Sequence, residues 1–132
     1  MSITVEWDNP ERTIILCTYR DTWTWEEFFG AAQEASDLQD TVQHTVDMVL
    51  DMRDSASTPS GVTGKFREIA RISHPNTGIR VLVTDADVMK LLFQVFATVY
   101  RPAARKYQVV DSLGKAYALI ANLQQQRATG VS

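Results

Sequence analysis

The chain has 132 residues, of which 45% are hydrophobic and 22% are charged, and its formal net charge is −3 at pH 7. This length predicts a single domain over residues 1–126, followed by a frayed tail over 127–132. The acidic balance disfavours nucleic-acid binding, which needs a basic face to neutralise phosphates. No apolar run approaches the roughly 18 residues that a membrane span needs, and no signal peptide is recognisable. We therefore expect a cytoplasmic protein without an integral membrane segment.

Two short strands are predicted at the start of the chain. Apolar and polar residues alternate over 3–7, and residues 13–19 are rich in β-branched and apolar types. The turn sequence Asp-Asn-Pro-Glu-Arg between them is short, so the strands form an antiparallel hairpin. Cys17, the only cysteine, lies within the second strand and is predicted to be a core residue, which suits a reducing cytoplasm.

A helix over 22–37 is predicted from its start signal. Thr24 suits the N-cap, Glu27 is its capping-box partner, and Trp23 is placed to pack against Phe28. The apolar residues that follow recur at helical spacing and would lie on the sheet: Trp25, Phe28, Phe29, Ala32 and Ala35.

The stretch over 46–64 is predicted to be the centre of the fold. It begins with a nearly continuous apolar run, typical of a strand buried on both faces of a parallel sheet: Val46, Met48, Val49, Leu50 and Met52. A polar loop over 54–64 follows, and residues 65–72 are predicted to be helical. Ligands of open α/β sheets bind beyond the strand C-termini, where helix N-termini present unpaired N–H groups. The loop therefore holds candidate phosphoacceptor or anion-binding residues, with a solvated turn as the alternative: Ser57, Thr58, Ser60 and Gly61.

The second half of the chain continues to alternate strands and helices. A strand is predicted over 79–84, then a third helix capped by Asp85 or Asp87 and running to about Arg101. A last strand over 107–110 precedes a final helix capped by Ser112. This order predicts an α/β fold: a mostly parallel mixed sheet, with the opening hairpin at or near an edge and about four helices.

The third helix has more apolar surface than a sheet can cover. Its apolar residues span an arc of roughly 200°, about twice what packing on a sheet requires. The excess is assigned mainly to Met89, Phe93, Phe96 and Tyr100. A second subunit in a homodimer, another partner, a bound apolar molecule or neighbouring helices would cover it. Trp23 and Trp25 are expected near the Ser60 loop, either as a ligand wall or as core packing.

No catalytic or metal motif stands out. Four carboxylates are expected at the C-terminal edge of the sheet, where they would repel phosphate, and caps and solvated turns explain them more simply than a cation does: Asp54, Asp85, Asp87 and Asp111. His44 and His74 have no evident nucleophile nearby, and the sequence holds no P-loop, G-x-S-x-G or dinucleotide-binding motif. We expect a protein that is not an enzyme and needs no cofactor or metal.

The chain resembles the STAS domain family, specifically the SpoIIAA-like branch of anti-sigma-factor antagonists. The resemblance covers essentially the whole chain and lies in the order of elements, the Thr-Trp-Glu-Glu-Phe helix start, and a buried strand ending at Asp51 before a Ser/Gly loop. In that family the first serine of an Asp-Ser-Ser-Gly loop is phosphorylated by a partner kinase, and Ser60-Gly61 is the nearest match here, with Pro59 in place of the acid.

The resemblance implies a non-enzymatic regulatory domain that acts through protein–protein contacts. Similar divergent members are regarded as uncharacterised or as binders of apolar ligands. The competing hypothesis is therefore a carrier or sensor of a small apolar ligand, with its pocket between the third helix and the sheet. A hydrolase acting at the Asp-rich edge is a third.

Overall fold

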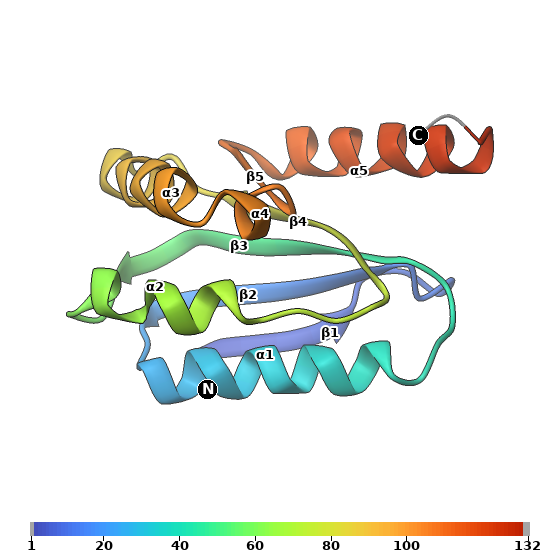
Figure 1. Ribbon diagram of the computed structural model, residues 1–132. Coiled ribbons are helices and arrows are strands. Elements are labelled where there is room, and N and C mark those ends of the chain that lie inside the picture. The colour runs from blue at the N-terminus through green and yellow to red at the C-terminus, as the bar shows by residue number, and fades with distance from the viewer. Residues whose placement is uncertain (1, 131–132) are drawn as a thin grey trace.

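The computed structural model describes residues 2–130, which form a five-stranded sheet and five helices (Figure 1). The strands are β1 (Ile3–Trp7), β2 (Ile14–Thr22), β3 (Val46–Ser57), β4 (Thr77–Val83) and β5 (Tyr107–Val110). The helices are α1 (Trp25–Gln39), α2 (Val62–Ala70), α3 (Asp87–Val99), α4 (Arg101–Ala104) and α5 (Leu113–Ala128). Strand order follows the chain, and only the edge pair β1–β2 is antiparallel, so the predicted α/β class and opening hairpin are confirmed.

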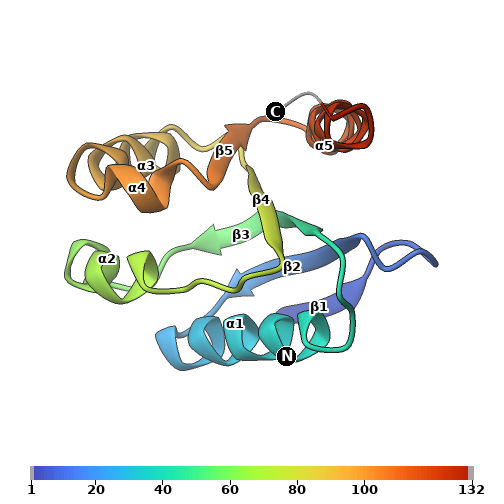
Figure 2. The same cartoon turned by 45° about the vertical axis from the view of Figure 1, so that its right-hand side comes forward.

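The two faces of the sheet are covered differently. Helices α1, α2 and α3 lie on one face, and α5 lies on the other, as Figure 2 shows. We call these the three-helix face and the α5 face. Side chains of a strand alternate between the two, so Met48 and Leu50 of β3 point to the three-helix face and Val49 to the α5 face. β3 is therefore buried on both sides, as predicted, with Val46 and Val49 fully inaccessible.

Helix starts follow the local signals in two cases. The Thr24 hydroxyl accepts from the Glu27 amide, and the Glu27 carboxylate accepts from the Thr24 amide, which completes the predicted capping box. Trp23 stacks on Phe28 with 5.7 Å between ring centroids. Ser112 accepts from the Lys115 amide and caps α5 as predicted.

The loop predicted over 54–64 is much shorter in the structure. β3 continues to Ser57 because its end pairs with the end of β2, where Arg20 lies opposite Asp54 and Thr22 opposite Ser57. α2 then begins at Val62, so the connection comprises only residues 58–61. A connection of this length is ordinary for an α/β unit, so its length gives no argument for function.

The region after β4 also departs from the prediction. The N-cap of α3 is Ala86, without a side-chain cap, so the assignment of Asp85 or Asp87 is wrong. Instead, the Thr84 hydroxyl accepts from the Ala86 amide at 3.2 Å. α3 ends at Val99, and Pro102 lies in the first turn of the short helix α4, which the sequence did not predict.

α5 is longer than predicted. It continues to Ala128, so Arg127 belongs to its last turn rather than to a frayed tail, while residues 131–132 lie outside the described part of the chain. Ala116 and Ile120 are fully buried and Leu119 and Leu123 pack around them, so these side chains share one face of α5. Within residues 2–130, no helix combines the length and the apolar character of a membrane span.

Candidate functional site

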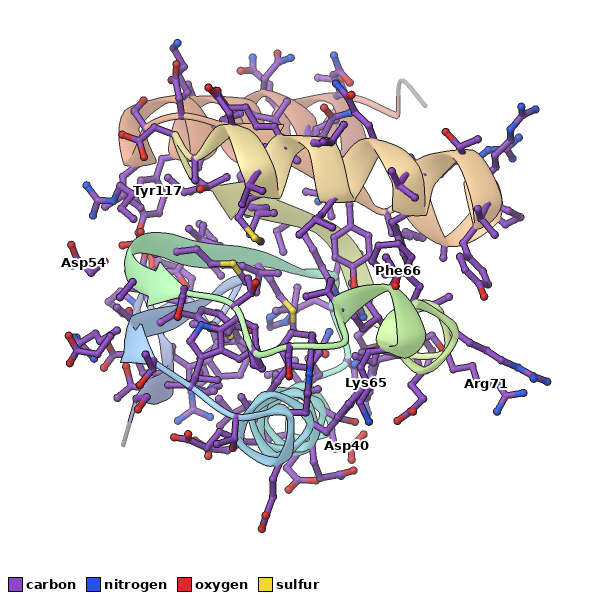
Figure 3. All side chains as sticks on the ribbon, turned by 90° about the vertical axis from the view of Figure 1, so that its left-hand side faces the viewer. Asp40, Asp54, Lys65, Phe66, Arg71 and Tyr117 are labelled. Carbon is purple, nitrogen blue, oxygen red and sulfur yellow. The ribbon has the colours of Figure 1, made fainter. Side chains whose placement is uncertain are left out.

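An apolar cavity of about 150 Å³ lies between the sheet and the helices α1, α2 and α3. Its floor consists of the side chains of β2 to β5 that point to the three-helix face: Cys17, Tyr19, Met48, Leu50, Met52, Arg80, Leu82 and Tyr107. Figure 3 views this region from the side and shows Phe66 pointing from α2 toward α3, while Arg71 points outward. Phe66 meets Phe96 of α3 with 5.4 Å between ring centroids, which closes part of the roof.

The sequence of α1 explains why space remains beneath it. The helix begins with bulky aromatic residues, but its sheet-facing side continues with Ala31, Ala32 and Ala35, all of which line the cavity. Alanine side chains are too short to fill the distance between a helix and a sheet, which is about 10 Å. The aromatic start of α1 contributes bulky side chains to the cavity wall, and its alanines leave space between the helix and the sheet.

Trp23 and Trp25 form part of the cavity wall. The Trp23 indole donates to the Ser55 hydroxyl at 2.9 Å, and the Trp25 indole donates to the Ser60 carbonyl at 2.8 Å. Both indole N–H groups therefore have partners, and the rings supply apolar surface. The second contact confirms that these residues reach the Ser60 segment. Trp23 belongs to the core, as one of the two predicted roles required, and it also lines the cavity. Contact of Trp23 and Trp25 with a ligand stays a prediction.

The residues of α3 divide into two groups. Met89, Phe93 and Phe96 line the cavity, and Tyr100 stacks on Phe96 at 5.6 Å without lining it. The apolar side chains left exposed are on the other half of the arc: Val88, Leu91, Val95 and Val99, at 42–64%. The predicted width of the arc is confirmed. The excess had been assigned to the wrong half, since Phe96 is buried at 4% exposure.

Arg80 is the one buried guanidinium of the cavity. It comes from the middle of β4, is only 6% exposed, and lies over the Tyr107 ring with its Cζ atom 5.3 Å from the centroid. None of the ion pairs among residues 2–130 includes Arg80. Burial raises the pKa of the Tyr107 phenol, and the charge of Arg80 partly offsets that rise. Sequence analysis missed Arg80, although a charge inside the apolar strand Ile-Arg-Val-Leu-Val is itself a signal.

A second buried charge, Asp47, lies on the α5 face. Its carboxylate is fully inaccessible and accepts two hydrogen bonds from the Arg127 guanidinium, at 2.8 and 2.9 Å. The Ile79 amide also donates to it at 2.9 Å, and Gln124 contacts it at 3.4 Å. This carboxylate ties α5 to the sheet. It was missed as well, because its partner lies 80 positions away in the sequence.

Cys17 occupies the predicted core position. It is 3% exposed and lines the cavity floor, and burial raises the pKa of its thiol to about 12. A thiol with such a pKa is neutral at physiological pH, so Cys17 contributes to the cavity as a small apolar side chain rather than as a nucleophile.

The candidate anion-loop residues lie together at the start of α2 but play different parts. Ser57 ends β3, Thr58 lines the cavity, and Ser60 is exposed. Gly61 is the N-cap of α2 with φ +78°, a backbone conformation that favours glycine. No side chain caps this helix start. Phosphorylation of Ser60 stays a prediction.

The acidic edge of the sheet gives no metal geometry within the described residues. Asp54, Asp85, Asp87 and Asp111 are exposed, and Asp111 pairs with Lys115 at 2.8 Å. Across residues 2–130, no three His, Cys, Asp or Glu side chains gather closely enough to hold a metal ion. His74, which lines the cavity, contacts Asp40 through Nε2 at 2.7 Å and accepts from the Asn76 amide through Nδ1.

Comparison with known proteins does not identify a relative. No protein family matches the sequence, and no curated protein is significantly similar to it. The resemblance to STAS domains therefore stays a prediction.

Proposed function

We propose that the protein binds a small apolar molecule in the cavity of the three-helix face and acts as a carrier or sensor. The observation that carries this proposal is the cavity itself, about 150 Å³ in size and lined by aromatic and aliphatic side chains. Protein interiors are normally packed as densely as organic crystals. A molecule that fills the cavity would cover this apolar lining and so stabilise the protein.

The volume limits the ligand. An engineered apolar cavity of about 150 Å³ in another protein stays dry and binds benzene. One aromatic ring or a short aliphatic chain is therefore the size that suits this cavity.

The test uses the tryptophans as reporters. Trp23 and Trp25 line the cavity, whereas Trp7 does not. In an NMR titration with p-xylene, we expect the indole N–H signals of Trp23 and Trp25 to shift saturably and that of Trp7 to stay in place. The contrary result is that neither p-xylene nor a carboxylate of similar size shifts the two signals saturably.

A pair of variants locates the binding. Ala32→Leu adds a bulky side chain inside the cavity and should weaken p-xylene binding, while Ala121→Leu adds the same side chain on the exposed surface of α5 and should not. Equal weakening by both variants, or by neither, would place the binding elsewhere.

A second candidate function, favoured by the exposed stripe of α3, is self-association. Self-association agrees with the regulatory domain of the STAS family, SpoIIAA-like branch, that the sequence predicts, because such a domain would act through protein–protein contacts. Val88, Leu91, Val95 and Val99 form an apolar stripe, with exposed Asp87 before it and Arg101 after it. In an antiparallel two-fold pair of α3 helices, each stripe covers the other and each Asp87 approaches the Arg101 of the second copy. The partner in this proposal is a second copy of the chain.

Sedimentation equilibrium tests this second candidate. We expect the wild-type chain to be a dimer at micromolar concentration and Leu91→Glu to be a folded monomer, while Ala121→Glu, on the α5 side of the sheet, stays dimeric. A monomeric wild-type chain would rule out self-association and leave the cavity proposal untouched.

A further inference from the structure

The position of Arg80 puts its charge at the centre of the cavity floor. In the sheet register, Arg80 lies between Met48 of β3 and Tyr107 of β5, and the side chains of all three line the cavity. Arginine stays protonated in proteins, and Arg80, as a residue that is only 6% exposed, holds its charge largely away from bulk water. Long basic side chains normally extend their charged ends into solvent. Arg80 does not do so.

Arg80 has an aromatic partner within the chain but no acidic one among residues 2–130. The Tyr107 ring, 5.3 Å away, provides a cation–π contact with the guanidinium. A buried arginine usually pairs with a carboxylate as well, because its planar N–H donors match two carboxylate oxygens. Arg127 pairs with Asp47 in this way, and among residues 2–130 no Asp or Glu does so for Arg80.

The other residues that line the cavity limit the charge and the size of a ligand that could pair with Arg80. Arg80 is the only arginine or lysine among the described residues that line the cavity, so a singly charged anion is balanced and a phosphate dianion is not. The remaining lining is mostly apolar and leaves room for about one ring. We infer that the ligand of this cavity is a small apolar monocarboxylate whose carboxylate pairs with Arg80, an inference that rests on the proposed function.

The experiment compares three probes of the same shape. Full-length protein is titrated with 4-methylbenzoate, 4-methylbenzamide and p-xylene, and the Trp23 and Trp25 indole signals report binding. The acid should bind at least about tenfold more tightly than the amide, because a charge-assisted bidentate contact is stronger than a neutral hydrogen bond.

Variants then test whether Arg80 makes the difference. Arg80→Met should remove the preference for the acid and keep p-xylene binding, whereas Arg105→Met, which removes an exposed arginine outside the cavity lining, should keep the preference. Arg80→Lys retains the charge but not the planar donor pair, so it should keep only part of the preference. It also provides a second variant if Arg80→Met folds poorly.

The outcomes separate the inference from the proposed function. Binding of p-xylene without preference for the acid over the amide in the wild type overturns the inference and leaves the apolar-ligand function standing. A preference that survives in Arg80→Met also overturns it. Failure of all three probes to shift the Trp23 and Trp25 signals overturns both.

Discussion

Each face of the sheet holds a buried charge, and the two charges differ in whether the chain supplies an oppositely charged partner. On the α5 face, Asp47 is fully buried, and its carboxylate is satisfied by Arg127, Gln124 and the Ile79 amide. On the three-helix face, Arg80 is almost as deeply buried and pairs with no acid among the described residues. The Asp47 charge has a structural role, because its partners are part of the chain. The second lies beside a cavity, so we assign its partner to a ligand.

Packing follows the same division. On the α5 face, Val49, Val81, Val83, Ala116 and Ile120 are all completely inaccessible. The three-helix face belongs to the same sheet, but a cavity of about 150 Å³ lies between it and its helices. Ile15 and Val46 are equally inaccessible on the three-helix face, so both faces contribute to the core, and the cavity gives the three-helix face room for a ligand.

The largest effect is expected from Arg127→Met. This change leaves the Asp47 carboxylate buried with fewer donors, and removing one partner of a buried ion pair costs about 3 kcal/mol or more. Urea unfolding should show the loss, with Arg105→Met as a control that removes a similar charge from an exposed site. A cost below about 1 kcal/mol would mean that Ile79 and Gln124 satisfy Asp47 alone.

The next effect tests how closely that pair is packed. A Cβ atom at Gly78 would overlap the Asp47 carboxylate and approach Arg127 Nη2 at 2.7 Å and Thr45 Cγ2 at 2.8 Å. Gly78→Ala should therefore destabilise the protein by about 2 kcal/mol. Gly30→Ala is the matched control, because nothing lies within 4 Å of its added Cβ, and alanine in the middle of α1 should stabilise the helix. Equal effects of the two substitutions would contradict the close packing.

Unlike Arg127→Met, Arg80→Met should not lower the free energy of unfolding. It removes a buried charge that has no acidic partner among residues 2–130, so the unfolding free energy without ligand should stay constant or rise by about 1 kcal/mol. Adding 4-methylbenzoate should raise the urea midpoint of the wild type and not that of the variant. A loss of about 2 kcal/mol or more in Arg80→Met would show instead that Arg80 is a structural residue like Arg127.

The elements with local signals could be predicted from the sequence, and those decided by distant contacts could not. Thr24 with Glu27, and Ser112, marked helix starts because capping bonds reach only three residues along the chain. The polar end of β3 looked like a loop. It is a strand because it pairs with the end of β2, and no local pattern reports that pairing.

The candidate site was predicted in part. The wide apolar arc of α3 was visible, but only the tertiary structure shows that Phe96 faces inward and Leu91 outward. Asp47 and Arg80 were both detectable as charges within strands buried on two faces. The sequence could not show that Asp47 has a partner 80 positions away and that Arg80 has none in the described chain.

The smallest effect concerns Asp51, a third charge on these central strands, whose partner is half-exposed. Arg53 donates two side-chain hydrogen bonds of 2.9 Å to Asp51, and these bonds hold the pKa of the Asp51 carboxyl below its ordinary value of 3.8. The carboxyl is thus more easily ionised in the folded than in the unfolded state. Its contribution to stability is present above pH 3.8 and is lost as the pH falls through the folded pKa.

Asp51→Asn tests this contribution. It should be slightly less stable than the wild type at pH 7, by less than about 1 kcal/mol, because the 43% exposed Arg53 side chain is screened by solvent. Urea unfolding from pH 7 to pH 3 should show the difference shrinking below pH 3.8. A difference that stays constant over this range would show that the Asp51 charge does not stabilise the fold. A loss as large as that of Arg127→Met would mean that Asp51 matters to the sheet as much as Asp47 does, despite its exposed partner.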